Sequence, residues 1–338
     1  MNEQYRLLDC TLRDGGHITN GNYGEKVIKS IIEKLVKARV NIIEVGFMWD
    51  SPQNSDMTRF YSMADVKKIL PKNLGNSKIS VMIEKQNLLW HIEDCDGTIE
   101  YVRVIFKRHL LDWACETASE LMKKGYKVFM NPVNCTVYTD DEYKEVIWRV
   151  NKIHPYAFSM VDTFGNFRLD LFERRFNLVN DNLDPDITMG IHLHENLGMA
   201  FGFVQRSIEL SYPNRKYVID GSLMGMGRDP GNLKIEQIAE HLNYKFNQGY
   251  DVLAIYEAIS ECIMPFYDKY NWGFKLPYAI SAYYGLHRTY PEFLMKKGTL
   301  SIKDIDIILS KVSHDQAEYY NEKYIEKLYE EYMKETSC

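Results

Sequence analysis

Two histidines, His192 and His194, are separated by a single residue near the end of an apolar run. Alternate residues of a β-strand point to the same face, so both imidazoles would project to one side while Leu193 packs on the other. Two converging imidazoles suit a divalent metal ion, and a carboxylate with open positions would complete a catalytic site. A pair of hydrogen-bonded structural histidines is the alternative, and it is the more common explanation of an isolated H-x-H.

A second polar cluster lies in the sequence DCTLRDGGH over residues 9–17. Arg13, Asp14 and His17 would lie on a loop after a strand, where Gly15 and Gly16 let the backbone turn tightly. Such a loop, taken alone, is more often exposed to solvent than part of a site. At a neighbouring strand end, however, Asp14 would bring the missing carboxylate to the histidine pair.

A glycine-rich segment, DGSLMGMGRDPGN, spans residues 220–232. It is not a dinucleotide fingerprint, because Pro230 stands where the last glycine is needed, and it lacks the Gly-Lys-Ser/Thr of a P-loop. A phosphate nest and a connection without ligand contacts both remain open for its glycines. We expect a loop that carries Asn232, with Arg228 as a second candidate, over the site.

Two further polar residues belong to predicted strands or their ends. Thr163 follows an apolar run and would offer a hydroxyl at the rim. Glu44 lies inside an apolar strand and must be paired if it is buried, because an unpaired buried carboxylate is costly. Arg13 and Arg103 are its candidate partners, and a structural ion pair is favoured over a role in holding a ligand.

The elements that must position these residues alternate between strands and helices. Amphipathic segments such as residues 24–38 separate near-continuous apolar runs, which is typical of a parallel sheet covered on both faces. Eight such units in roughly 240 residues predict an α/β fold, a (β/α)8 TIM barrel, whose active site lies at the carboxyl ends of the strands. A doubly wound open sheet is the alternative. The strands are expected near Arg6–Cys10, Asn41–Phe47, Ile79–Ile83, Tyr101–Phe106, Lys127–Asn131, Ala157–Asp162, Thr188–His194 and Tyr217–Ser222.

After residue 243 the pattern changes to charged and aromatic stretches without intervening strands. We therefore expect a TIM-barrel catalytic domain over residues 1–243 and a helical C-terminal extension or domain over residues 244–338.

The composition excludes several classes of protein. With 47 acidic and 41 basic residues among 338, the net charge is −6, which does not favour a nucleic-acid or anionic membrane surface. No run approaches the ~18 apolar residues that span a bilayer. The six cysteines form no C-x-x-C pair and the first residues lack the pattern of a signal peptide. A cytoplasmic protein with reduced thiols is expected.

Together the three motifs resemble the DRE-TIM metallolyases, a pyruvate-lyase-like superfamily of metal-dependent TIM barrels. The resemblance covers about residues 5–235, from D-x-T-L-R-D-G through H-x-H to the terminal Gly-Asn. Acyl-CoA synthases of the superfamily have Glu-Gln after Arg-Asp-Gly and the lyase has Leu-Gln, whereas this chain has Gly16-His17. That difference resembles 4-hydroxy-2-oxovalerate aldolase. It implies a class II aldolase for 4-hydroxy-2-oxo acids, pyruvate and an aldehyde; an acyl-CoA lyase or Claisen-type synthase is the alternative.

The resemblance also implies a cofactor. Asp14, His192, His194 and Asn232 are expected to hold a divalent metal ion. Mn²⁺ is the expected ion, with Mg²⁺ and Co²⁺ as alternatives.

The resemblance further implies roles for four residues. His17 would be the catalytic base, Arg13 would bind substrate and stabilise the enolate, and Thr163 would contact the substrate. Tyr278, in the segment 276–284, is the expected counterpart of a tyrosine that lines the pocket in the family aldolase. The partners are then a small 2-oxo acid and an aldehyde, and no nucleic acid or membrane. A homodimer is allowed, and an aldehyde dehydrogenase partner is left open.

Overall fold

The computed structural model describes residues 3–51, 54–84 and 92–336, and its centre is a closed barrel of parallel strands. Neighbouring barrel strands pair in chain order, and β1 pairs with both β2 and β9 to close the ring. A two-residue strand, β3 (Arg59–Phe60), adds to the carboxyl end of β2. The eight barrel strands are β1 (Tyr5–Asp9), β2 (Ile42–Met48), β4 (Lys78–Ile83), β5 (Tyr101–Phe106), β6 (Lys127–Pro132), β7 (Ala157–Asp162), β8 (Thr188–Leu193) and β9 (Tyr217–Gly221).

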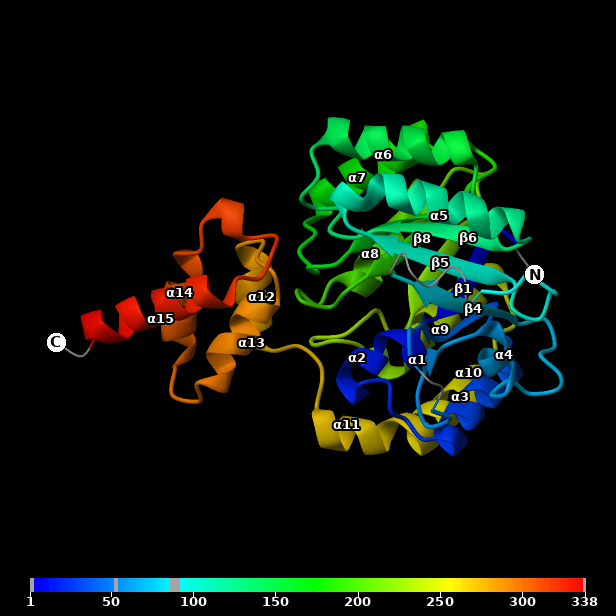
Figure 1. The fold of residues 1–338 in the computed structure, drawn as a ribbon, viewed down its shortest axis with the longest axis horizontal. Helices are drawn as coiled ribbons and strands as arrows, with labels where there is room; N and C mark the ends of the chain where they lie inside the picture. The colour runs from blue at the N-terminus through cyan, green and yellow to red at the C-terminus, as the bar shows by residue number, and fades with distance from the viewer. Residues whose placement is uncertain (1–2, 52–53, 85–91, 337–338) are drawn as a thin grey trace.

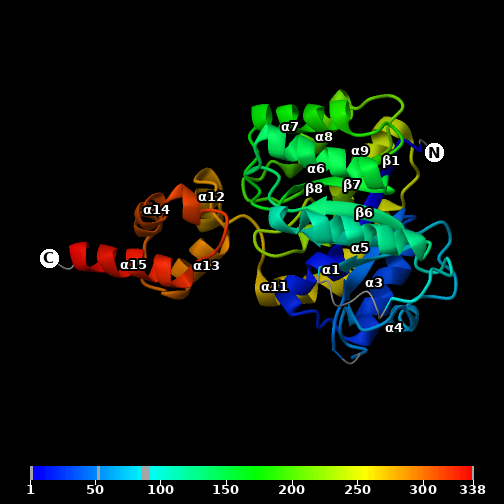
Figure 2. The same ribbon diagram turned by 45° about the horizontal axis from the view of Figure 1, so that its top comes forward.

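Helices cover the outside of this barrel (Figures 1 and 2). They form because their apolar residues recur at helical spacing: in α3 the side chains of Ile28, Ile31, Ile32 and Leu35 are fully buried. The helices up to the last barrel strand are α1 (Thr11–Asp14), α2 (Gly16–Thr19), α3 (Glu25–Lys37), α4 (Met63–Lys67), η2 (Arg108–Leu110), α5 (Leu111–Lys123), α6 (Asp140–Ile153), α7 (Leu169–Asn182) and α8 (Ala200–Leu210).

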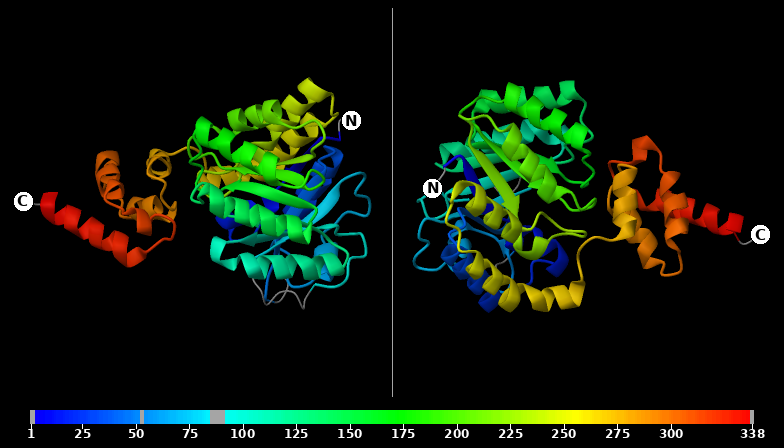
Figure 3. Two further views of the ribbon diagram at one scale, coloured as in Figure 1. Left: turned by 90° about the horizontal axis from the view of Figure 1, so that it is seen from above. Right: turned by 180° about the vertical axis from the view of Figure 1, so that it is seen from behind.

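Only helices follow the last strand in the described part of the chain. In Figures 1 and 3 those from α12 onward stand to one side of the barrel. They are η3 (Leu223–Gly225), α9 (Ile235–Phe246), α10 (Val252–Ala258), the π-helix η4 (Ile259–Ile263), α11 (Met264–Tyr270), α12 (Leu276–Tyr283), α13 (Thr289–Lys296), α14 (Ile302–Ser310), η5 (His314–Gln316) and α15 (Glu322–Thr336).

These helices belong to two separate hydrophobic cores. The segment from Tyr250 to Trp272 contributes its buried side chains to the core of the barrel. A second core begins at Leu286 and joins α13, α14 and α15 through residues such as Tyr290 and Ile308. The division of the chain at residue 243 stays a prediction, and the cores themselves separate further along, between Trp272 and Leu286.

The predicted TIM barrel with C-terminal helices is confirmed. Every predicted barrel strand agrees with the structure to within one residue at each end. The sequence pattern did not indicate β3, because a strand of two residues is too short to show any periodicity. Within the described residues, no helix combines the length and apolar character that crossing a membrane requires.

Candidate active site and metal centre

Three chain segments meet at the carboxyl ends of the barrel strands. The turn of helix after β1 carries Arg13 and Asp14, and His192 and His194 lie at the end of β8. The segment after β9 returns so that Asn232 pairs with His194 through an isolated antiparallel bridge. The closure of the barrel thus brings together residues that are more than 200 positions apart in the sequence.

Both histidines direct the same ring nitrogen toward one carboxylate. The Nε2 atoms of His192 and His194 lie 3.4 and 3.9 Å from Asp14 Oδ2. His192 Nδ1 lies 3.0 Å from Asp220 Oδ2, and His194 Nδ1 donates to the main-chain carbonyl of Asp162 at 2.7 Å. Because each Nδ1 already has its own acceptor, Nε2 is the ring nitrogen of each histidine that faces Asp14, and it is the atom each could offer to a metal ion.

Electrostatics favour an ionised carboxylate at the centre of this group. Burial alone would raise the pKa of Asp14, but Arg13 and the hydrogen bond with His192 hold it well below its usual range. Burial, followed by the neighbouring His192, lowers the pKa of His194 to about 3, so this imidazole is neutral at neutral pH. A negative carboxylate beside a neutral imidazole is a donor set that fits a divalent cation.

Asn232 supplies an independent test of fit. Its Nδ2 donates to the Met226 carbonyl at 3.2 Å, while its Oδ1 is buried and has no hydrogen-bond partner among the described residues. A buried acceptor without a partner is costly unless a ligand satisfies it. The amide oxygen of Asn232, beside His194, is therefore available to a cation, and the four residues predicted from the sequence fit a metal ion.

Cys10 is a neighbour of this centre that the sequence reasoning did not select. Ligand atoms of Cys10, Asp14 and His192 lie within 4.8 Å of one another. The Cys10 thiol, however, donates to the Gly221 carbonyl at 3.3 Å, and burial raises its pKa well above the usual value. Thiolate is the form that binds metal. The protonated Cys10 thiol therefore fits a residue that packs beside the metal site better than it fits a metal ligand.

A buried ionic network supports the histidine pair. Glu44 Oε2 accepts from Arg13 Nε at 2.7 Å and from Arg103 Nη1 at 3.1 Å, and Arg103 also pairs with Asp220. The sequence allowed Arg13 or Arg103 as the partner of Glu44, and the structure shows both. Through Asp220 this network reaches His192 and restricts the orientation of its ring.

Gly15, which follows Arg13 and Asp14, is packed closely against the preceding helix turn and Tyr23. Gly15 and Gly16 were expected to permit a tight turn, but they join two short helices, and φ of Gly15 is an ordinary −60°. A Cβ atom on Gly15 would lie 2.5 Å from both the Thr11 carbonyl oxygen and the Tyr23 hydroxyl. Close packing, rather than an unusual backbone angle, therefore requires a glycine at position 15.

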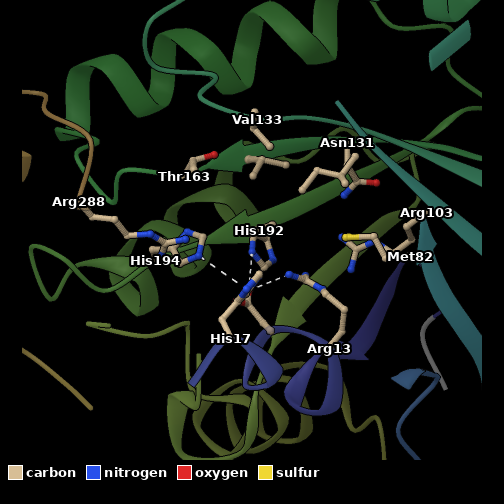
Figure 4. A pocket seen from close by; sticks show the side chains of 13 residues that line it. Arg13, His17, Met82, Arg103, Asn131, Val133, Thr163, His192, His194 and Arg288 are labelled. Atoms are coloured by element: carbon tan, nitrogen blue, oxygen red, sulfur yellow. Dashed lines mark ion pairs between the residues drawn. The ribbon is translucent and has the colours of Figure 1, made fainter. Parts of the chain in front are cut away.

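A small cavity of about 60 Å³ opens above these residues (Figure 4). His17, on α2, lines the cavity and is exposed to solvent on one side. Desolvation by the surrounding protein lowers the His17 pKa to about 4; Asp14 raises this pKa, whereas Arg288 and Arg13 lower it further. Thr163 also lines the cavity, and its Oγ1 accepts a hydrogen bond from the main-chain N–H of Asn134 at 2.8 Å. The lining residues are Arg13, Asp14, His17, Met82, Arg103, Ile105, Asn131, Val133, Val161, Thr163, His192, His194 and Arg288.

Two sequence candidates lie elsewhere. Tyr278 is buried in α12 and does not line the described cavity, so its catalytic role rests on the resemblance alone. Arg228 donates to Thr289 Oγ1 at 2.6 Å and pairs with Glu292 at 3.1 Å. It joins the glycine-rich loop to α13 instead of projecting into the cavity.

Besides several apolar residues, two polar lining residues were missed by the sequence reasoning. Asn131 is the last residue but one of β6, and its Oδ1 is buried with no partner among the described residues. Its position at a strand end could have indicated it. Arg288 lies between α12 and α13, far from every motif, and nothing in the sequence pattern points to it.

The fold and these residues define a (β/α)8-barrel enzyme with a candidate divalent-metal centre at the carboxyl ends of its strands. The chain belongs to the HMGL-like family, whose model matches residues 4–261. The family consists of divalent-metal-dependent enzymes of the DRE-TIM type, and the chain is accordingly a lyase- or aldolase-type enzyme.

Curated relatives cover several reactions. A 4-hydroxy-2-oxovalerate aldolase of Thermomicrobium roseum is 24% identical over 268 residues, which cover 77% of this chain and 73% of the aldolase. A 2-isopropylmalate synthase of Buchnera aphidicola is also 24% identical, over 70% of this chain and 47% of the synthase. An oxaloacetate decarboxylase of Mycobacterium tuberculosis is 23% identical over 68% of this chain and 67% of the decarboxylase.

Solved structures show the same fold. The N-terminal domain of a candidate aldolase from Bacteroides vulgatus superposes with a TM-score of 0.72 at 24% identity, covering 90% of this chain and 99% of that domain. An HMG-CoA lyase from Brucella melitensis gives a TM-score of 0.62 at 16% identity, covering 76% of this chain and 96% of the lyase.

Proposed function

We propose that the protein is a divalent-metal-dependent aldolase that cleaves 4-hydroxy-2-oxo acids to pyruvate and an aldehyde, or forms them by the reverse reaction. The observation that carries this proposal is that His17, a candidate base, lines the same cavity as Asp14, His192 and His194. The Gly-His pair at positions 16–17 and the aldolase relatives support the same reaction.

The metal centre would use Asp14, His192, His194 and Asn232, and Mn²⁺ is the proposed ion. When bound, the ion would act as a Lewis acid on the keto oxygen of a 2-oxo acid and stabilise negative charge there. The residues around it hold this donor set rigid: Asp220 fixes His192, and the Asp162 carbonyl fixes His194.

His17 would take the proton of the substrate 4-hydroxyl while the bond between C3 and C4 breaks. With a pKa of about 4 its imidazole is neutral at neutral pH and can accept a proton, directly or through a water molecule. An aldehyde would leave, and the enolate of pyruvate would remain until protonation at C3 gives pyruvate. In the synthetic direction His17 would return the proton to the new hydroxyl.

Arg13 would stabilise the enolate oxygen. Burial opposes its charge, but Glu44 and Asp14 raise the pKa of Arg13, so the guanidinium stays positive. A fixed positive charge in a cavity with little water stabilises charge that develops during the reaction. Thr163 lines the same cavity and would contact the substrate through its hydroxyl.

The first test is pyruvate release from a panel of 4-hydroxy-2-oxo acids, measured after chelation and again after Mn²⁺ is added. Release that depends on the metal would support the proposal, and the preferred chain length would indicate the aldehyde. No release from any member of the panel, while calorimetry shows that Mn²⁺ binds, would overturn the proposal in favour of acyl-CoA substrates. An assay with acyl-CoA thioesters would then test the lyase or synthase alternative.

The remaining expectations about partners and location also stay proposals. The partners would be the small 2-oxo acid and the aldehyde, without nucleic acid or membrane. A cytoplasmic location, a homodimer and a dehydrogenase partner each require a separate measurement.

A further inference from the structure

Arg288 extends into the cavity from outside the barrel. It lies at the N-terminus of α13, in the helical region after the barrel, and its side chain is 9% exposed. The other residues that line the cavity all come from the first 194 positions of the chain. Arg288 is therefore the contribution of the C-terminal helices to the cavity.

Arg288 also differs from the other two arginines of the cavity in its charge balance. Arg13 contacts Glu44 and Asp14, and Arg103 contacts Glu44 and Asp220. In the described part of the chain, no carboxylate lies within 4.0 Å of the Arg288 guanidinium. The acid nearest along its helix, Glu292, is paired with Arg228 instead.

The hydrogen-bonding capacity of Arg288 is largely unused. Its Nη1 donates to the Arg228 carbonyl at a long 3.4 Å, and the structure gives it no other hydrogen bond among the described residues. A guanidinium carries five N–H donors in a planar fork that matches a carboxylate or a phosphate. Burial, reinforced by Arg228, lowers the pKa of Arg288 to about 9. A buried cation without a counter-ion is costly, so an anion from the substrate would be stabilising at this position.

The position of Arg288 indicates which end of the substrate it would contact. Figure 4 shows Arg288 on the His194 side of the cavity, whereas Arg13 and Arg103 lie on the opposite side of His192. The metal centre and Arg13 already match the carboxylate and keto oxygen of a 2-oxo acid. A substrate held there would extend its other end away from Arg13.

We propose that Arg288 is a specificity-determining residue that binds an acidic group, carboxylate or phosphate, on the aldehyde half of the substrate. The substrates would then be 4-hydroxy-2-oxo acids with a second anionic group at the far end. This inference rests on the proposed aldolase function for the identity of the two substrate halves. The binding of an anion by Arg288 can be measured separately from turnover.

The binding test compares 2-oxoglutarate with 2-oxopentanoate, which have equally long carbon chains and differ in the second carboxylate. Calorimetry with the Mn²⁺-loaded protein should show 2-oxoglutarate binding about tenfold more tightly, as expected for a charge-assisted hydrogen bond. In Arg288→Gln this preference should disappear. Equal binding of the two acids by the unsubstituted protein, or an unchanged preference in Arg288→Gln, would overturn the proposal even if the aldolase reaction is confirmed.

A structural role for Arg288 is tested with Arg108→Gln as the matched control. Arg108 pairs with Glu142 and, at 3.4 Å, with Glu318, so it also joins the barrel to the C-terminal helices, but it does not line the cavity. Arg108→Gln should keep the preference for 2-oxoglutarate. Loss of the preference in both variants would attribute the effect to loosened helices and overturn the proposal. If Arg288→Gln does not fold, Arg288→Met removes the charge and keeps an unbranched side chain, and a preference undiminished in that variant would also overturn the proposal.

The aldol reaction then distinguishes binding of a carboxylate from binding of a phosphate, and contact with the aldehyde half from contact with the pyruvate half. The rate of condensation with pyruvate is compared between succinic semialdehyde and butanal, and between glyceraldehyde 3-phosphate and glyceraldehyde. The favoured pair identifies carboxylate or phosphate, and Arg288→Gln should raise KM for that acidic aldehyde. If the substitution instead raises KM for pyruvate equally with every aldehyde, Arg288 contacts the pyruvate carboxylate and the assignment to the aldehyde half is wrong. If no aldehyde reacts, the proposed function fails while the binding comparison still decides the role of Arg288.

Discussion

Asp220 Oδ2 lies 3.0 Å from His192 Nδ1 and leaves the opposite ring nitrogen, Nε2, directed at Asp14. The same carboxylate also pairs with the buried guanidinium of Arg103. One side chain therefore connects a candidate metal ligand to the ionic network inside the barrel. Removing its charge should disturb metal binding without removing any ligand.

Asp220→Asn should weaken Mn²⁺ binding by about 10- to 100-fold, because a neutral amide holds the His192 ring less firmly and makes it less basic. Competition with a fluorescent chelator would measure this change. Asp268→Asn, at an exposed position on α11, is the matched control and should leave the affinity unchanged. Equal affinity in Asp220→Asn and the unsubstituted protein would remove Asp220 from the metal centre.

His17→Ala should lower kcat for pyruvate release by about 100- to 10,000-fold, the range expected when a general base is lost. The Mn²⁺ content should stay the same, because His17 is outside the proposed donor set. His109→Ala, at an exposed position in η2, controls for the loss of an imidazole elsewhere. Full activity in His17→Ala would show that another group is the base.

Mn²⁺ should stabilise the folded protein, since the donor set exists only in the folded chain. At about a hundredfold excess over Kd the gain in the free energy of unfolding is about 2.7 kcal/mol, visible as a higher Tm. His192→Ala should lose this shift together with activity. A shift that persists in His192→Ala would place the metal elsewhere on the protein.

The pH dependence of kcat/KM should reflect the lowered pKa of His17. A base is active when it is unprotonated, so the rate should fall only as the pH approaches about 4, instead of near the ordinary value of 6.5. The metal content is measured at each pH, because protonation of the ligands would also reduce the rate. A midpoint near 6.5 with the metal fully bound would contradict the environment described for His17.

Glu44→Gln should destabilise the fold by about 3–5 kcal/mol, because it leaves two buried guanidinium groups short of a counter-charge. Urea denaturation monitored by fluorescence would measure the change. Glu33→Gln, on the surface of α3, should change the free energy of unfolding by less than about 0.5 kcal/mol. Similar effects in the two variants would show that the network contributes little to stability.

The sequence alone was sufficient to determine the barrel and most of the candidate site. The strands are short runs buried on both faces and the helices carry apolar residues at regular spacing, and both are properties of neighbouring residues. The projection of His192 and His194 to one side followed from the alternation of a strand, and their meeting with Asp14 followed from the rule that strand ends converge in a barrel.

The tertiary structure alone decided which distant side chains share the cavity. Arg288 reaches the cavity because Arg228, in the loop after β9, contacts Thr289 and Glu292 at the start of α13, and no local periodicity encodes that long-range contact. The pairing of Glu44 with two arginines and the proximity of Cys10 to Asp14 likewise depend on contacts across the barrel. Local patterns determine the faces of each element, whereas long-range packing determines which faces meet.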